Sequence, residues 1–585
     1  MTNAEIARVL QEVADVLEIR QGDSFRIRAY RNAARTVEAQ TEPLARLVAE
    51  ARPLTALPGI GKQMAAHVRE LIETGTLAYR DELLAEIPRS LIDLMRLPGV
   101  GPKRAFRLWQ ELGIQTVEGL EEAARGGRIA PLAGFGAKSQ QKILEGIAAA
   151  RQYTGRLLLA TAERHVEPLL AYLRLGPPEA RVEVAGSYRR RCETIGDIDL
   201  LAVGGEAAAG RPAVMARFLA YPQIERVLMA GDTRGTVVLG SGLQVDLRVV
   251  PPESWGAALV YFTGSKEHNV KLRQRALHQK KRVSEYGAFR LEGDQPEEAL
   301  EWIAGREEAD VYAAVGLPWI PPELREDRGE IEAAARGALP ELLRLEDLRG
   351  DLHMHSTWSD GSETIESMLA ACAAKGYEYV ALTDHSKALP MVRGLDERRL
   401  ELQWAEIAAV AARHPEIRLL KGLEVDILAD GALDLADDSL ARLDLVVVSL
   451  HSRFELPAAE QTARVLRALE HPAVSIWAHP TARMINRRRA VELDLEAVLA
   501  RAAELGVAVE LNASPNRLDL KDTDLLLAKR LGCKIVISTD AHRIAELGSM
   551  RYGVEQARRA SLGPGDVLNT RPLPDLLAAL RRPGR

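Results

Sequence analysis

The sequence is poor in cysteine and in aromatic residues. Its three cysteines (Cys192, Cys372 and Cys533) lie too far apart to suggest a disulfide framework or a thiolate zinc site. Aromatic residues make up only 4%, so we expect cores of leucine, alanine, valine and isoleucine. No apolar run approaches the roughly 18 residues of a membrane span, and the first residues read as an amphipathic helix, not as a signal peptide. These absences favour a cytoplasmic protein.

The sequence also lacks a large excess of either basic or acidic residues. The 77 basic and 83 acidic residues leave a formal net charge of −6. This balance excludes a chain that is basic all over, but it is compatible with a local basic face that binds nucleic acid. The 585 residues exceed what one hydrophobic core can hold, so we expect roughly three to five domains.

Residues 1–150 have apolar positions at helical spacing and contain three similar glycine turns, LPGIGKQMA, LPGVGPKRA and LAGFGAKSQ. A glycine turn between two short helices exposes backbone amides, and the missing side chains let a phosphate approach closely. A turn that only caps a helix is the alternative, and three copies argue against it. We therefore predict DNA-contacting helical hairpins in two domains, 1–85 and 86–150, through Gly59, Gly61, Lys62, Gly99, Gly101, Lys103, Arg104, Gly134 and Gly136.

From 151 to 255 the pattern changes to the alternation of strands, and a charged stretch to about 318 reads as helical. Asp197 and Asp199 share one face of a predicted strand, and Asp246 lies on another. Neighbouring carboxylates repel each other, and bound Mg²⁺ with substrate phosphates relieves that repulsion. The three aspartates are therefore candidates for a two-metal site, although an aspartate pair alone is equally compatible with a solvated strand edge.

Two further motifs flank these aspartates. Gly186, Ser187 and Arg190 offer amide, hydroxyl and guanidinium donors to phosphates. Downstream, the segment YFTGSKEHN is followed by Arg273. From residue 1 to about 337 the combination resembles the family X DNA polymerases, gap-filling enzymes with the nucleotidyltransferase fold. The resemblance implies an α+β palm at 151–255 and a nucleotide-selection subdomain at 256–318. The proline and charge content of the segment that follows indicates a linker or packing strap at 319–348.

The resemblance also implies roles for individual residues. Asp197, Asp199 and Asp246 would hold the catalytic Mg²⁺ or Mn²⁺ ions, and Gly186, Ser187 and Arg190 would bind the triphosphate. The residues around the incoming nucleotide would be Tyr261, Phe262, Gly264, Asn269 and Arg273. Animal members form a Schiff base through a lysine where this chain has His67. An imidazole cannot form that imine, so we do not expect lyase activity of this type.

Residues 349–585 alternate short apolar strands with helices, and most of the strands end in His, Asp or Glu. Polar residues at the carboxyl ends of parallel strands mark the active face of a β/α barrel. Eight of the twelve histidines follow residue 348. The candidate metal ligands are His353, His355, Asp360, His385, Glu424, His451, His479, Asp540 and His542.

This pattern resembles the polymerase-and-histidinol-phosphatase (PHP) domain, a distorted β/α barrel of metal-dependent phosphoesterases. By that resemblance His353, His355, Glu424 and Asp540 would hold a first metal, and Glu424 would bridge to a second on His451 and His479. Asp360, His385 and His542 would hold a third. Imidazole and carboxylate ligands suit Mn²⁺ or Zn²⁺. Arg453 and Arg483 are candidates for binding the substrate phosphate, or are only surface arginines.

The two resemblances predict a multidomain DNA polymerase that fills short gaps during repair and carries a 3′-5′ exonuclease in its barrel. Its partners would be gapped or nicked duplex DNA and deoxynucleoside triphosphates, and a monomer is the default. Two alternatives stay open. The barrel could act as an abasic-site endonuclease or 3′-phosphatase with the polymerase half as a DNA clamp, or the chain could be a non-enzymatic scaffold. The twelve retained metal ligands disfavour the scaffold.

Overall fold

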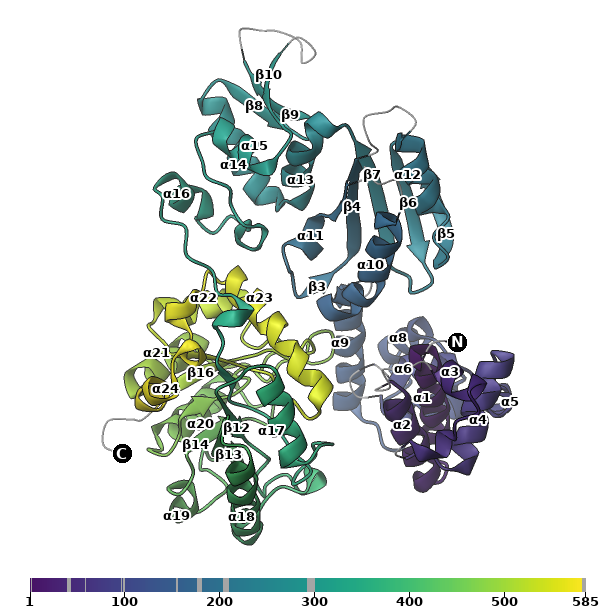
Figure 1. Cartoon of the computed structure of the whole chain (residues 1–585). Helices are drawn as coiled ribbons and strands as arrows, with labels where there is room; N and C mark the ends of the chain where they lie inside the picture. The colour runs from purple at the N-terminus through teal and green to yellow at the C-terminus, as the bar shows by residue number, and fades with distance from the viewer. Residues whose placement is uncertain are drawn as a thin grey trace. The chain divides into compact units, whose positions relative to one another are not determined.

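The computed structural model divides into two compact units, Met1–Thr154 with Asn486–Arg488, and Gly155–Ile485 with Arg489–Arg585 (Figure 1). The residues that the structure describes are 1, 3–38, 44–57, 59–95, 97, 100–153, 156–175, 181–203, 210–291 and 300–580. Within these ranges, no helix combines the length and the apolar character needed to cross a membrane.

The first unit is helical, as its 3- and 4-residue apolar spacing predicts. Buried aliphatic side chains such as Leu10, Val13, Leu71 and Leu108 form its core. The elements are α1 (Asn3–Ile19), α2 (Ser24–Glu38), α3 (Leu44–Ala49), η1 (Leu54–Ala56), α4 (Lys62–Thr74), α5 (Ala78–Glu86), α6 (Ser90–Met95), α7 (Pro102–Leu112), α8 (Val117–Arg125) and α9 (Ala137–Tyr153).

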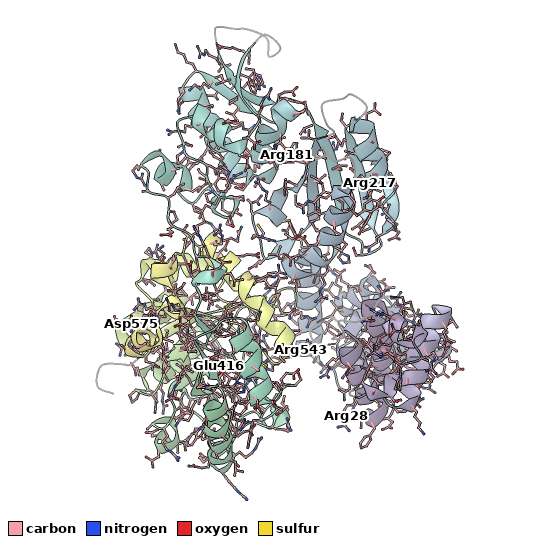
Figure 2. All side chains as sticks on the ribbon, in the orientation of Figure 1. Arg28, Arg181, Arg217, Glu416, Arg543 and Asp575 are labelled. Carbon is pink, nitrogen blue, oxygen red and sulfur yellow. The ribbon has the colours of Figure 1, made fainter. Side chains whose placement is uncertain are left out.

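The second unit begins with a five-stranded sheet in the order β2-β4-β7-β6-β5. Strands β4 and β7 are parallel and the other pairs are antiparallel. Helix α12 packs against β6 and β7, and Arg217 of α12 donates to the carbonyl oxygen of Tyr172 in α10 at 2.8 Å (Figure 2). The elements are β1 (Leu157–Leu158), α10 (Leu159–Arg174), β2 (Arg181–Val184), α11 (Gly186–Arg189), β3 (Thr194–Ile195), β4 (Asp197–Val203), α12 (Gly210–Leu219), β5 (Ile224–Ala230), β6 (Arg234–Leu239), β7 (Gln244–Val250) and η2 (Pro252–Ser254).

Residues 255–314 combine helices with a three-stranded antiparallel sheet. They form α13 (Trp255–Thr263), α14 (Lys266–His278), β8 (Lys281–Ser284), β9 (Gly287–Arg290), β10 (Glu301–Ala304) and α15 (Glu308–Ala314). The expectation of helix throughout is wrong for the strands. Val283 points into the core while Arg282 is exposed, and a two-residue turn at Glu285 and Tyr286 joins β8 to β9. Buried and exposed side chains alternate there with a period of two residues, as in a strand, and the many charged residues of the segment made this alternation hard to recognise in the sequence.

The segment at 319–348 packs onto the second unit. Its elements are η4 (Pro322–Leu324), α16 (Glu330–Ala335) and η5 (Leu345–Asp347). Arg325 is fully buried and pairs with Glu308 of α15 at 2.8 Å. Because a buried arginine needs a carboxylate and further hydrogen-bond acceptors, this pair holds the segment against α15.

Residues 349–580 form a barrel whose seven parallel strands follow each other in sequence order (Figure 1). A bridge between Met354 and Ala541 joins the ends of the first and last strands, so the barrel is nearly closed. The strands are β11 (Gly350–Asp351), β12 (Tyr379–Leu382), β13 (Arg418–Asp426), β14 (Leu445–Ser449), β15 (Ile476–Trp477), β16 (Ala508–Asn512) and β17 (Ile535–Ser538). The predicted β/α barrel is confirmed.

Helices cover the outside of this barrel, as expected where both faces of a parallel sheet are buried. They are α17 (Ile365–Ala374), η6 (Pro390–Val392), α18 (Glu397–Arg413), α19 (Asp437–Leu440), α20 (Ala458–Glu470), α21 (Leu495–Leu505), α22 (Asp522–Arg530), η7 (Ile544–Ser549), α23 (Met550–Arg559), η8 (Pro564–Asp566), η9 (Leu568–Thr570) and α24 (Leu573–Leu580). Connections at the carboxyl ends of the strands carry the polar residues singled out in the sequence.

Candidate active sites

Three aspartates gather on one face of the palm sheet. Asp199 of β4 lies in register with Asp246 of β7, and Asp197 lies two residues before Asp199 on the same face. Between them Ile198 and Leu200 point the other way and are 0% and 1% exposed. The strand alternation therefore places the carboxylates together and seats the intervening side chains in the core.

The carboxylates of these three aspartates repel one another. Burial, together with the carboxylates of Asp197 and Asp246, raises the pKa of Asp199 to about 6. Asp246 is held by two neighbours, because its Oδ1 accepts a hydrogen bond from Thr236 at 2.5 Å and its Oδ2 accepts one from Gln244 at 2.8 Å. Close carboxylates of this kind suit a divalent cation with oxygen ligands.

Gly186 lies directly against Asp199. A Cβ atom at Gly186 would come within 2.5 Å of Asp199 Oδ2, and the φ of +61° belongs to the left-handed region. The neighbouring amide of Ala185 donates to the carbonyl oxygen of Asp199 at 2.8 Å. Glycine is therefore required here both for the conformation and for the close approach. Ser187 follows in the short helix α11, half-buried.

The other predicted nucleotide residues cluster around the end of α13. Arg190 donates to the carbonyl oxygen of Thr263, next to Gly264, which has a φ of +70°. The rings of Tyr261 and Phe262 lie 5.0 Å apart, and Asn269 donates to the carbonyl oxygen of Tyr261 at 2.6 Å. Arg273 lines the same small pocket as Tyr261 and Asn269. All of these residues thus belong to one continuous region of α11, α13 and α14.

Two of the predicted hairpin turns share a local geometry. Gly59 and Gly134 have φ values of +73° and +82°, and Gly61 and Gly136 each stand directly before a helix. Nothing lies within 4 Å of a Cβ atom placed at Gly61 or Gly136, or at Gly101, which precedes α7. These positions have the space that a phosphate needs. Gly99 lies outside the described residues.

The basic residues beside these turns differ in their surroundings. Lys62 and Lys103 are exposed, whereas Arg104 donates to the carbonyl oxygen of Gly134 at 3.0 Å and lies over the ring of Phe135. Arg104 thus links the second turn to the third.

The histidine at the lyase position is packed against aromatic rings. His67 accepts or donates a hydrogen bond with the Tyr30 hydroxyl at 2.9 Å, and its ring centroid lies 5.8 Å from those of Tyr30 and Tyr79, which lie 6.1 Å from each other. Burial lowers its pKa. These contacts give His67 a packing role among the aromatic rings of the helical unit.

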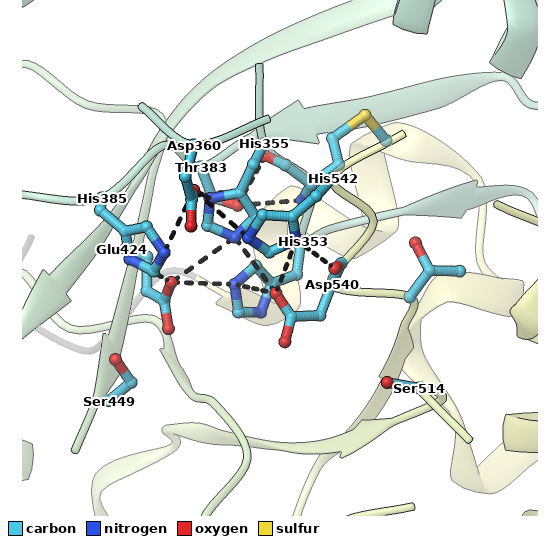
Figure 3. A network of polar contacts seen from close by, with 12 residues as sticks. His353, His355, Asp360, Thr383, His385, Glu424, Ser449, Ser514, Asp540 and His542 are labelled. Carbon is cyan, nitrogen blue, oxygen red and sulfur yellow. Dashed lines mark hydrogen bonds and ion pairs between the residues drawn. The ribbon is translucent and has the colours of Figure 1, made fainter. Parts of the chain in front are cut away.

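In the barrel, the predicted ligands converge at the carboxyl ends of the strands, and Figure 3 shows those other than His451 and His479. Three groups place their ligand atoms within 4.8 Å of one another. They are His355, Asp360, His385 and His542; His353, His355 and Asp540; and His385, Glu424 and His451. His479 joins the last group through Glu424, at 2.9 Å from Nε2 to Oε1. All nine predicted ligands therefore lie in one cluster.

The grouping in the structure differs in part from the division that the resemblance implied. His355 belongs to two groups, and His385 reaches Glu424 at 2.9 Å as well as Asp360 at 3.5 Å. Glu424 stands at the centre, with histidines at both of its oxygens. Burial alone would raise its pKa, but the surrounding histidines, His385 first, hold the pKa of Glu424 well below its usual range.

The donor atoms fit bound cations. Both ring nitrogens of His355 and Nε2 of His353 are buried and make no hydrogen bond within the described chain. Carboxylate oxygens of Asp540 and Glu424 lie 3.2 to 3.6 Å from the two Nε2 atoms. Burial, with His542 and His385, lowers the pKa of His355 to about 3, so its ring is neutral and can ligate a metal.

The sequence analysis did not predict the residues that contact the metal ligands from behind. Glu510 is fully buried and accepts hydrogen bonds from His353 Nδ1 at 2.8 Å and from the amide of His479 at 2.7 Å. Asp426 lies 3.3 Å from Nδ1 of His451. Such partners orient ligating imidazoles. The sequence does contain a signal for Glu510: it lies two residues before Asn512, the polar residue at the end of the same strand, and therefore on the same face.

The two candidate phosphate-binding arginines have different surroundings. Arg453 is exposed. Arg483 is buried and pairs with Glu193 at 2.6 Å, and it also donates to the carbonyl oxygen of Leu518. Glu193 lies just before β3, outside the barrel. Arg483 therefore joins the barrel to the palm in this structure.

Both sites gather the ligands that phosphoryl transfer with divalent cations requires, which defines a nucleotidyltransferase fused to a metal-dependent phosphoesterase barrel. Family models match residues 1–77 (helix-hairpin-helix domain), 91–149 (SAM-like helix-hairpin-helix tandem), 258–326 (DNA polymerase beta thumb) and 351–512 (PHP domain). Over 585 residues, 100% of both chains, the sequence is 39% identical to the DNA polymerase/3′-5′ exonuclease PolX of Bacillus subtilis. The chain belongs to the family X DNA polymerases that carry a PHP domain.

The barrel is also similar to shorter proteins. A probable phosphatase of Syntrophotalea carbinolica is 29% identical over 229 residues, which cover 37% of this chain and 90% of the relative. A probable phosphatase of Thermoanaerobacter sp. is 28% identical over 231 residues, 38% of this chain and 89% of the relative. The PHP barrel thus occurs alone as well as fused to a polymerase.

Proposed function

We propose that this chain extends DNA primers from a template, filling short gaps during repair, and that its barrel removes nucleotides from DNA 3′ ends. The observation that carries the proposal is the match over the full length to a protein named as both polymerase and 3′-5′ exonuclease. The joint presence of three palm aspartates and nine barrel ligands adds support.

In the palm, we assign Asp197, Asp199 and Asp246 to metal binding. Mg²⁺ or Mn²⁺ bound there would neutralise the triphosphate and favour attack by the primer 3′-oxygen. Asp246 would accept the proton of the 3′-hydroxyl, and the hydrogen bonds from Thr236 and Gln244 hold its carboxylate in place for that transfer. Arg190 would pair with the phosphates and balance the negative charge that develops as pyrophosphate leaves.

In the barrel, the imidazoles and carboxylates suit Mn²⁺ or Zn²⁺. Bound ions would lower the pKa of a water molecule, so that it attacks phosphorus at neutral pH. The protein holds the ligands in place: Glu510 fixes the ring of His353, and Asp426 fixes that of His451. A neutral His355 donates a lone pair without first losing a proton.

Substrate binding would begin at the hairpins. The open turns at Gly61, Gly101 and Gly136 present backbone to DNA phosphates independently of sequence. Lys62 and Lys103 stand beside two of these turns and would add salt-dependent contacts. Because gapped or nicked DNA is found in the bacterial cytoplasm, we expect the protein to act there.

A second candidate activity is removal of a 3′-phosphate by the same barrel. The relatives named probable phosphatase are 29% and 28% identical over 229 and 231 residues of this chain, about the length of the barrel. A 3′-phosphate is a phosphomonoester, and in both reactions water would attack phosphorus and the 3′-oxygen of the DNA would leave. The difference is that the phosphorus attacked by the exonuclease also carries the 5′-oxygen of the terminal nucleoside. Hydrolysis of a 3′-phosphate would clean a DNA end before extension.

The decisive assay uses a 5′-labelled primer on a duplex with a one-nucleotide gap, with Mn²⁺, with and without nucleotides. Extension by one nucleotide when nucleotides are present, and shortening when they are absent, is the expected result. Shortening alone would refute the polymerase assignment. A second primer that ends in a 3′-phosphate separates the two barrel activities, because a phosphatase changes its mobility without removing a nucleotide.

A further inference from the structure

Arg559, at the end of α23 in the barrel, reaches into the polymerase half. Its side chain is only 6% exposed. Its Nη1 donates to the backbone carbonyl oxygen of Arg190 at 2.6 Å and to Oε1 of Glu326 at 2.8 Å. On the other side, Nη2 and Nε donate to Asp522 of α22 at 2.7 and 3.1 Å. One guanidinium thus contacts the barrel, the 319–348 segment and the palm.

Glu326 is shared between two arginines. Arg190 Nε donates to the same oxygen, Oε1, at 3.0 Å that accepts from Arg559. Burial alone would raise the pKa of Glu326, but Arg559 and Arg190 outweigh it and the pKa is lowered. The carboxylate is therefore charged at neutral pH, and its charge is divided between Arg559 and the arginine proposed to bind the triphosphate.

Arg190 is positioned by this arrangement from two directions. Its side chain lies between Glu326 and the carbonyl oxygen of Thr263, which precedes Gly264. Its backbone is anchored by Arg559. If Arg559 were removed, Glu326 would pair with Arg190 alone and neutralise it, because a buried carboxylate draws the nearest remaining cation.

We propose that Arg559 of the PHP barrel is a positioning residue for the polymerase, keeping Arg190 available to the triphosphate of the incoming nucleotide. The inference rests on the proposed function, in which Arg190 binds that triphosphate. It makes the barrel a structural part of the nucleotide site as well as a separate nuclease.

Other ion pairs across the same boundary do not have this arrangement. Arg558, the residue before Arg559, pairs with Glu323 at 2.8 Å and donates to the carbonyl oxygen of Leu343 at 3.1 Å. No interaction of Arg558 with Arg190 is found in the described part of the chain. Arg558 therefore offers a matched control with the same side chain, the same helix and the same kind of partner.

The test measures single-nucleotide gap filling as a function of nucleotide concentration. For Arg559→Met we expect the KM for the nucleotide to rise about 10-fold, since loss of one partner of a buried charged pair affects binding strongly. The kcat should change by less than about 3-fold, because the catalytic aspartates are untouched. The 3′-5′ nuclease activity and the melting temperature should match those of Arg558→Met. A KM equal to that of the unmodified chain would overturn the inference, as would an equal rise in Arg558→Met.

A second variant separates positioning from general loosening of the boundary. Glu326→Gln removes the competing charge, so adding it to Arg559→Met should bring the KM back toward that of the unmodified chain. Arg559→Lys should give an intermediate KM, since an ammonium keeps the charge without the planar fork. Should Arg559→Met not fold, Arg559→Lys alone decides: a raised KM supports the inference, and a KM equal to that of the unmodified chain contradicts it. If the unmodified chain adds no nucleotide, the proposed function itself is wrong; a normal unmodified chain with a normal Arg559→Met overturns only this inference.

Discussion

In the palm, Asp197 is exposed and Asp199 half-buried, whereas in the barrel His353, His355 and Glu424 are each at most 1% exposed. In the palm, burial and the neighbouring carboxylates of Asp197 and Asp246 raise the pKa of Asp199 to about 6, although Arg248 and Arg190 act against this rise. The barrel acids face histidines, which hold the pKa of Glu424 and Asp540 well below the usual range. Repulsion therefore acts among the palm carboxylates, whereas the barrel carboxylates are paired with histidines.

This difference bears on when each site is completed. Interlocked ligands with partners such as Glu510 are in place before any substrate arrives. Three mutually repelling carboxylates need cations and phosphates to reach their working arrangement. We therefore expect the palm to depend on its substrate for assembly, and the barrel to depend on its own packing.

The largest expected effect is a clean separation of the two activities. Asp246→Asn should lower primer extension by about a thousandfold or more, because a ligand and proton acceptor is lost. Nuclease activity should stay within about 2-fold. His353→Ala should give the opposite pattern. Both rates are read from one gapped substrate with and without nucleotides.

Two matched controls accompany these variants. Asp310→Asn changes an exposed acid of α15, and His414→Ala changes a histidine that pairs with Glu416 outside the metal cluster. Neither should alter either rate. Loss of both activities in Asp246→Asn would mean that the sites are not independent, and the comparison drawn above would fail.

The layer behind the barrel ligands should have the next largest effect. Glu510→Gln replaces one of the two acceptor oxygens of Glu510 with an amide, so His353 Nδ1 or the amide of His479 loses its partner. We expect the Mn²⁺ concentration for half-maximal nuclease activity to rise about 10- to 100-fold, with extension unaffected. Glu504→Gln, an exposed change on α21, serves as the control. An unchanged Mn²⁺ requirement would show that the ligands hold themselves in place.

The two sites also differ in how far the sequence predicts them. Motif spacing was sufficient for the ligands, since strand alternation carries Asp197 and Asp199 to one face and strand ends carry the histidines to one rim. It was not sufficient for Glu510 or Asp426, whose role depends on which strands become neighbours in the barrel. Strands β8 to β10 were missed because their charged residues hid the alternation, and the link from Arg559 to Arg190 joins residues 369 positions apart.

The tight approach of Gly186 to Asp199 tests the palm arrangement. Gly186→Ala places a methyl group 2.5 Å from Asp199 Oδ2 at a φ of +61°. We expect extension to fall about 10-fold as the carboxylate moves, together with a loss of about 1 kcal/mol in stability from the left-handed backbone. Gly242→Ala is the matched control, because it has a φ of +83° and nothing within 4 Å. Equal losses in both variants would attribute the effect to the backbone alone.

The smallest expected effect concerns Glu555 of α23, which lies where the barrel meets the palm. Like the palm aspartates, Glu555 has a second carboxylate nearby, but no substrate or metal site is proposed there. Burial, with a contribution from the nearby Glu163, raises the pKa of Glu555 to about 7, even though Arg191 lies 3.1 Å away and lowers it. A carboxyl whose folded pKa exceeds its unfolded value near 4.5 contributes stability below that value and loses it as the pH rises through 7. Glu555→Gln should therefore match the unmodified chain at pH 5 and exceed it by about 1 to 2 kcal/mol at pH 8.5. Urea unfolding at the two pH values measures the difference. If the free energy of unfolding of Glu555→Gln differs from that of the unmodified chain by the same amount at both pH values, Glu555 is ionised at both, with Arg191 as a sufficient partner. Repulsion between carboxylates would then be confined to the palm site.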